Sequence, residues 1–152
     1  MDALQKIVEG WLMDLGKTLG RPLPLSADGV CRLDHPNAPT MILEVPAASP
    51  MLYYSSPLVK LEQGASELEL CKRALSLNLF QVETAGTTLA LDEKTGEIVM
   101  CLLHPIEGMT SERFQNVLNN FLVTAISLRE QLQKGGSKAV ASRRPHGNRI
   151  SI

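Results

Sequence analysis

This sequence of 152 residues has few cysteines, no long apolar run and no excess of one charge. Its three cysteines are odd in number and widely spaced, which argues against a disulfide scaffold and favours a reducing compartment. No apolar run approaches the roughly 20 residues that a membrane-spanning helix needs. The N-terminus lacks a basic stretch followed by an apolar block, so we expect no secretory signal. With 44% apolar and 20% charged residues, the composition is that of one globular domain.

The net charge of −1 hides an asymmetry along the chain. All 16 acidic residues lie at or before Glu130, together with only ten of the 15 basic residues. An acidic body repels phosphate backbones, which argues against nucleic acid and favours a basic or mixed polypeptide partner. The tail contains no aromatic residue for stacking on bases, so we interpret it as a solvated terminus. Its five basic residues are Lys134, Lys138, Arg143, Arg144 and Arg149.

Two long segments have apolar residues at helical spacing. The first helix is expected over residues 2–19, and Gly20 ends it. The last helix is expected over residues 111–134. No periodicity follows, so we expect one domain over residues 1–134 and a basic, mobile tail over residues 135–152.

A further helix is expected to begin near Ser66, where Ser66 and Glu69 have the spacing of a capping box. Its apolar residues form two adjacent stripes, where one core-facing stripe is what a surface helix normally needs. The first stripe consists of Leu68, Cys71, Leu75 and Leu79, and the second of Leu70, Ala74 and Leu77. We therefore expect a second copy of the chain to cover the excess apolar surface.

Five strands are predicted from short apolar or alternating segments bounded by turn residues. They cover residues 30–35, 41–45, 51–61, 87–91 and 97–103. Pro57 lies inside the third segment and predicts an edge strand or a bulge. Residues 92–96 end in a glycine and are typical of a hairpin loop with that glycine at positive φ. The order α-β-β-β-α-β-β-α predicts an α+β two-layer sandwich with a twisted antiparallel sheet.

Four residues raise the alternative of a metal site or a catalytic site: Cys31, His35, Cys101 and His104. Cys101 and His104 are three apart in a predicted strand and should point to opposite faces, whereas a closed metal site needs all four residues to converge. The sequence leaves open a cysteine that lies beside a histidine in space. A small α+β enzyme, or a metal- or ligand-binding domain that uses these four residues, is therefore the alternative hypothesis.

Two segments carry a resemblance to a known family. One runs from Leu89 to Leu102 (LALDEKTGEIVMCL) and the other from Phe114 to Leu122 (FQNVLNNFL). With the element order, the acidic body and the length, they resemble the class I chaperones of bacterial type III secretion, the Tir-chaperone-like family. The resemblance covers about residues 1–134, and the basic tail departs from the usual ending of the family.

The resemblance implies a cytoplasmic bacterial homodimer that is not an enzyme and needs no metal or other cofactor. It implies a chaperone that binds an extended segment near the N-terminus of a secretion effector and keeps that effector soluble and secretion-competent. Components of the secretion apparatus are implied as further partners, without nucleic acid and without membrane insertion. An extended segment can add to a sheet edge and place alternate side chains in apolar pockets, so the implied function is physically coherent.

The resemblance also implies two sets of site residues. Apolar residues of the first helix and second strand are expected to receive effector side chains: Leu4, Val8, Trp11, Leu12, Met41, Leu43 and Val45. The second helix and the strand after it are expected to form the dimer interface, through Leu70, Ala74, Leu77, Leu89 and Leu91. The stripe of the first helix is equally consistent with a core, so the sequence leaves open which of its residues face the effector.

Overall fold

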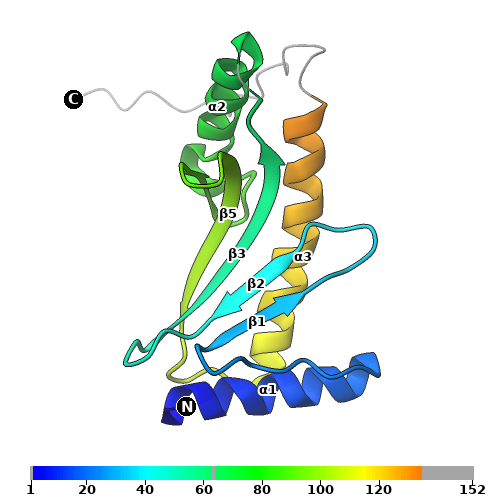
Figure 1. Ribbon diagram of the computed structural model, residues 1–152, viewed down its shortest axis with the longest axis vertical. Helices are drawn as coiled ribbons and strands as arrows, with labels where there is room; N and C mark the ends of the chain where they lie inside the picture. The colour runs from blue at the N-terminus through cyan, green and yellow to red at the C-terminus, as the bar shows by residue number, and fades with distance from the viewer. Residues whose placement is uncertain (1, 63, 135–152) are drawn as a thin grey trace, which may run out of the picture.

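The computed structural model describes residues 2–62 and 64–134, and its elements follow the predicted order (Figure 1). The helices are α1 (Ala3–Leu19), α2 (Ala65–Leu77) and α3 (Ser111–Gln133), with a 3₁₀ turn, η1 (Leu79–Gln81), after α2. The strands are β1 (Val30–Leu33), β2 (Met41–Glu44), β3 (Met51–Lys60), β4 (Thr88–Asp92) and β5 (Glu97–Pro105). The α+β class is thereby confirmed, while the predicted tail over residues 135–152 lies outside the described residues.

The strands form one antiparallel sheet in the order β1-β2-β3-β5-β4, so β1 and β4 are its edges. Helix α3 lies along one face of the sheet, and α1 crosses the N-terminal end of α3 (Figure 1). Helix α2 lies at the other end, beside β4 and the C-terminal part of α3. Within residues 2–62 and 64–134, no helix is both long and apolar enough to cross a membrane.

Pro57 lies within β3 and does not interrupt it. Because β3 runs between β2 and β5, the prediction of an edge strand is wrong. The prediction of a bulge is confirmed, since the register with β5 shifts between Pro57 and Val59. A bulge accommodates a residue that has no N–H to donate to the ladder.

The core lies between α3 and the sheet and continues beneath α1. The buried residues of β3 alternate along the strand, as expected for a sheet with one covered face: Leu52, Tyr54, Ser56 and Leu58. The Tyr54 and Phe121 rings lie 5.7 Å apart and join the sheet to α3. The Trp11 and Phe114 rings stack at 5.5 Å and join α1 to α3.

The three helices begin in different ways. A capping box starts α1, because Gln5 N–H donates to Asp2 and Asp2 N–H donates to the Gln5 side chain, each at 2.9 Å. The capping box predicted at Ser66 is wrong, since α2 starts after Gly64 and has no side-chain cap. Thr110 caps α3 by accepting a hydrogen bond from Arg113 N–H at 3.2 Å.

Gly29 brings the start of β1 against the end of β2 and the first turn of α1. Its φ is +78°, and a Cβ here would collide with Val45 O and lie 2.6 Å from Gln5 Nε2. These neighbours are themselves bonded, since Gln5 Nε2 donates to Val45 O at 3.0 Å and Val45 N–H donates to Gly29 O at 2.8 Å. The contact between α1 and the sheet therefore depends on the absence of a side chain at this position.

Replacing Gly29 with alanine is expected to lower the free energy of unfolding by about 2–4 kcal/mol. About 1–2 kcal/mol comes from the left-handed backbone, and the rest from displacing Val45 and Gln5. Gly20→Ala is the matched control, because Gly20 has φ +67° with no atom within 4 Å of a built Cβ. Chemical denaturation followed by circular dichroism measures both variants, and equal losses would contradict the close approach at Gly29.

Candidate functional site

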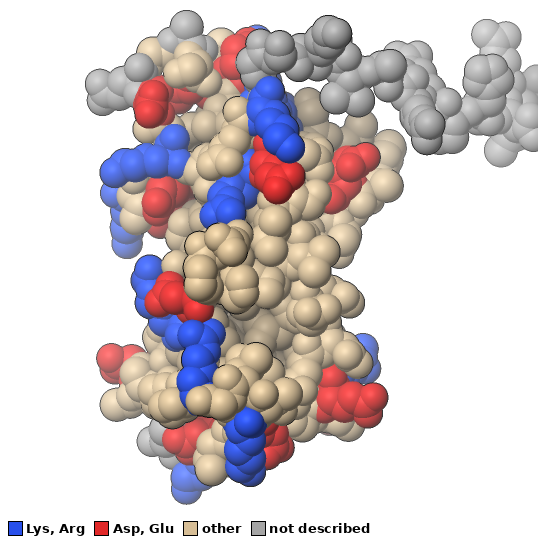
Figure 2. Space-filling view, turned by 90° about the vertical axis from the view of Figure 1, so that its right-hand side faces the viewer, with Lys and Arg blue, Asp and Glu red and all other residues tan. Residues whose placement is uncertain are grey.

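A groove opens between α1, the β1–β2 hairpin and α3, and we call it the α1–α3 groove. Its volume is about 170 Å³. The apolar lining comes from all three elements: Leu15, Leu19, Leu33, Met41, Leu118 and Leu122. Polar residues complete it: Arg21, Asp34, His35, Gln115 and Asn119. Figure 2 views this side of the molecule, where the middle is uncharged and hollowed and the charged residues lie around it.

Hydrogen bonds from two arginines fix the outer wall of the α1–α3 groove. Arg21 Nη2 donates to Asp34 O at 3.0 Å, and Arg129 Nη2 donates to Asn37 O at 3.1 Å. Thr40 Oγ1 also donates to the Asp34 carboxylate at 2.7 Å. The loop between β1 and β2 is thereby held against α3 and the segment that follows α1, so the groove is preformed.

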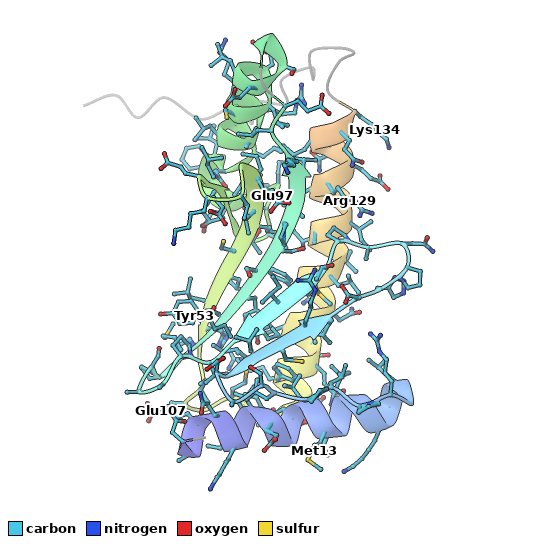
Figure 3. All side chains as sticks on the ribbon, in the orientation of Figure 1. Met13, Tyr53, Glu97, Glu107, Arg129 and Lys134 are labelled. Carbon is cyan, nitrogen blue, oxygen red and sulfur yellow. The ribbon has the colours of Figure 1, made fainter. Side chains whose placement is uncertain are left out.

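A second hollow, the α1 outer hollow, lies on the opposite flank of α1 and measures about 410 Å³. Its walls come from the second half of α1 and the segment that follows: Glu9, Met13, Gly16, Lys17, Gly20, Arg21, Pro22, Leu23 and Pro24. Met13 points away from the body of the protein and is 58% exposed (Figure 3). Arg21, just after the C-terminal end of α1, lines both hollows.

The second candidate surface is an exposed apolar run on α2 and the turn after it. We call it the α2 run, and its side chains are 60–86% exposed: Leu68, Leu75, Leu79, Phe80 and Val82. Phe80 is the most exposed of them and has φ +57°, in a region that favours glycine. Five large apolar side chains exposed in one segment make the α2 run a candidate surface for another polypeptide.

Two further surfaces carry apolar residues. A groove of about 380 Å³ lies between α3 and β5, with mixed apolar and polar walls: Ala85, Thr87, Leu102, His104, Val117, Asn120, Phe121, Val123 and Thr124. On the sheet face away from α3, Tyr53 of β3 is paired with Leu103 of β5, and both side chains are exposed. The α1–α3 groove differs from both in that its apolar lining comes from α1, the β1–β2 hairpin and α3 together.

The structure places most of the predicted effector-binding residues inside the core. Leu4 is half-buried, and the other six are buried: Val8, Trp11, Leu12, Met41, Leu43 and Val45. Met41 also lines the α1–α3 groove, whereas the exposed apolar side chains of α1 are Ile7, Met13 and Leu19. The assignment of the seven residues to effector binding stays a prediction, and the groove residues beside them were missed because they come from three separate segments.

The predicted dimer residues lie at several depths. Ala74 and Leu89 are buried within the protomer, Leu70 and Leu77 are half-buried against its core, and Leu91 is 46% exposed. Their assignment to a dimer interface stays a prediction. Of the two stripes noted in the sequence, the one that begins at Leu68 supplies the exposed leucines. The two-stripe pattern was the signal for this surface, but it did not say which stripe faces outward.

The four residues of the alternative hypothesis are not brought together on one face. Cys31 is buried and His35 lies exposed in the following loop. Cys101 pairs with Ser55 on the sheet face away from α3, whereas His104 pairs with buried Leu52 on the opposite face. Within residues 2–62 and 64–134, no group of three or more His, Cys, Asp or Glu residues could hold a metal ion.

The family model described as Tir chaperone protein (CesT) matches residues 10–129. The chain belongs to this family. The match spans α1, the sheet, α2 and most of α3, and it confirms the resemblance to class I type III secretion chaperones. No curated protein sequence matches the chain.

Solved structures share the fold of this Tir chaperone family member. A chain of the HopA1–SchA chaperone–effector complex is 23% identical, with a TM-score of 0.65 over 86% of this chain and 98% of the other. A chain of the ExsC–ExsE complex is 22% identical, with a TM-score of 0.70 over 90% and 100%. A chain of the ExoU–SpcU complex from the type III secretion system of Pseudomonas aeruginosa is 20% identical, with a TM-score of 0.60 over 82% and 93%.

Burial raises the pKa of the Cys31 and Cys101 thiols, although Arg21 opposes this at Cys31. Both thiols should react with iodoacetamide at neutral pH more slowly in the folded than in the urea-unfolded protein, because the thiolate is the reactive form. The free energy of unfolding should also fall as pH rises above the ordinary thiol pKa of about 8.5, since only the unfolded chain then ionises. Mass spectrometry measures the alkylation rates. A thiol that reacts faster in the folded protein would favour the enzyme hypothesis.

Proposed function

We propose that this protein is a cytoplasmic bacterial chaperone that binds an extended segment near the N-terminus of a type III secretion effector. In this proposal the chain acts as a homodimer and has no catalytic activity. The observation that carries the proposal is the preformed α1–α3 groove in a chain of the Tir chaperone protein family. The neighbouring folds come from complexes described as chaperone–effector or type III secretion assemblies, which supports the same conclusion.

The α1–α3 groove suits the apolar side chains of an extended peptide. Leu33 belongs to the edge strand β1 and lines the groove, so a peptide that lies along β1 passes over the groove floor. Alternate side chains of such a peptide point to the same side, and every second one can enter the groove. The polar residues at its border, Arg21 and His35, can satisfy peptide groups that remain near solvent.

The two hollows beside α1 suit a segment longer than a single strand. Because Leu19 lines the α1–α3 groove and Gly20 lines the α1 outer hollow, a segment that leaves the groove can continue over the end of α1 into the second hollow. Pro22 and Pro24 line the second hollow. Because proline has no backbone N–H, neither residue leaves an unpaired donor there. A segment bound in this way buries apolar side chains that would otherwise promote aggregation, which is the basis of keeping the effector soluble and ready for components of the secretion apparatus.

The α2 run supports the homodimer. A monomer would leave five large apolar side chains in water along α2 and η1, whereas a second copy can cover them with the same surface in a two-fold arrangement. A dimer carries two α1–α3 grooves, so one long effector segment gains affinity from linked contacts. We retain Leu70, Leu77 and Leu91 as interface residues at the border of this surface.

Leu19→Asp tests the α1–α3 groove. Leu19 is half exposed and lines the groove, so the carboxylate would lose hydration when a partner side chain enters. We expect at least about tenfold weaker binding of a co-expressed effector from the same bacterium, equivalent to about 1.4 kcal/mol. Isothermal titration calorimetry with the effector segment measures the affinity.

Ile7→Asp is the matched control for the groove, because Ile7 lies on the same helix with similar exposure but lines neither hollow. It should bind the effector like the unmodified chaperone. Equal weakening by both substitutions would place the binding site elsewhere on α1 and contradict the groove.

Leu75→Asp tests the homodimer. Leu75 is 71% exposed in the protomer, so the substitution should preserve the fold and place a charge in the contact between copies. Sedimentation velocity should show a shift to monomer, with the melting temperature of the monomer retained. Ser76→Asp, one residue along the same exposed end of α2, is the control and should remain dimeric. A dimer that persists in Leu75→Asp at low concentration would exclude the α2 run as the interface.

A further inference from the structure

One side chain occupies the outer edge of β4. Asn78 Nδ2 donates to Leu89 O at 2.9 Å, and Asn78 Oδ1 accepts from Leu89 N–H at 2.8 Å. A side-chain amide carries the same donor and acceptor as a peptide group. The two bonds are therefore those that a residue of a neighbouring antiparallel strand would make with Leu89.

The Asn78 amide is held in place by the end of a helix. Asn78 is the C-cap of α2, and its N–H donates to Ala74 O at 3.2 Å. Its own carbonyl accepts from Gln81 N–H at 3.0 Å. The backbone of Asn78 is thereby fixed at the end of α2, which places its side-chain amide beside Leu89.

The position next to Leu89 on the same edge is also engaged. The N–H and C=O of Leu89 both point away from β5. Because these groups alternate in direction from one residue to the next along a strand, the N–H and C=O of Thr87 and Leu91 also point away from β5. Thr87 N–H donates to Thr84 O at 3.0 Å within the preceding turn. Two successive outward positions of the edge are thus occupied, and an incoming strand would meet Asn78 in the middle of any pairing.

The edge that Asn78 covers is otherwise suited to pairing with another strand. Leu89, Ala90 and Leu91 follow one another in β4, and Leu91 is 46% exposed. The α2 run lies on the segment that leads into Asn78 and continues just after it, so copies that meet through this run bring their β4 edges into the same region. Exposed apolar edge strands pair with one another unless something covers or charges them.

We propose that Asn78 closes the β4 edge against the β4 strand of a second copy, so that copies can associate through the α2 run without joining their sheets. This inference rests on the association through the α2 run in the proposed function, but not on which effector is bound. Asn78 is a specificity-determining residue in this role, since it selects one mode of self-association over another.

Asn78→Ala tests the proposal in the full chain. We expect the Leu89 amide to exchange its hydrogen at least about tenfold faster at low protein concentration, because its acceptor is gone. As concentration rises, sedimentation velocity should show species of at least twice the mass of the unmodified protein. Asn116→Ala, an exposed asparagine on α3, is the control and should change neither measurement.

Asn78→Asp separates edge pairing from a general loss of packing. The aspartate keeps an acceptor for Leu89 N–H, and its charge repels the carbonyl groups of an incoming strand. This variant should therefore keep the mass of the unmodified protein. Asn78→Ser, which retains one hydrogen-bonding group on a shorter side chain, provides the same mass measurement if the alanine variant does not fold.

Two results would overturn the proposal. One is an Asn78→Ala or Asn78→Ser protein that folds but keeps its mass at every concentration, which would make Asn78 only a link between α2 and β4. The other is assembly of Asn78→Asp to the same extent as Asn78→Ala. Failure of the chaperone to bind an effector would leave these measurements unchanged, so the two proposals fail separately.

Discussion

The packing of α3 against β3 is the constraint on which the other surfaces depend. Phe121 against Tyr54 and Phe114 against Trp11 hold the helix to the sheet and to α1. Burial of these rings removes a large apolar area from water, which is the main favourable term in folding. It also commits the inner stripe of α1 to the core. What remains for a partner is the outer side of α1 and the groove that α1 and α3 form together.

Local patterns were sufficient to predict the elements but not their depth. Helical spacing and strand alternation depend on neighbouring residues, so the element order and the opposite orientations of Cys101 and His104 were predicted correctly. On α2 the two stripes are equally apolar in sequence. The side of α2 that faces the protein is fixed by distant residues. Asn78, at the end of α2, bonds to Leu89, which is 11 residues away, and Arg73 on α2 bonds to Leu132, which is 59 residues away. No local pattern contains that information.

The candidate site was predicted less well than the fold for the same reason. An apolar residue on α1 has the same sequence signature whether it packs in the core, as Leu12 does, or borders a groove, as Leu19 does. The groove also needs Leu118 from α3, about a hundred residues later in the chain, and the bond from Arg129 that positions the hairpin loop. These long-range requirements become visible only when the elements are assembled.

The two edges of the sheet differ in what a partner strand must displace. On β1, Val30 is bonded to the backbone and hydroxyl of Ser26, and the Asp34 carbonyl is bonded to Arg21. Ser26 is an exposed loop residue, so a peptide can replace its hydrogen bonds to Val30 at a net difference near zero, while the Arg21 bond that holds the groove wall remains. On β4, Asn78 is half-buried at the end of α2, so solvent is less able to replace its two hydrogen bonds to Leu89. In the proposed function, strand addition is therefore expected at the edge that borders the α1–α3 groove, where the same peptide also buries its apolar side chains.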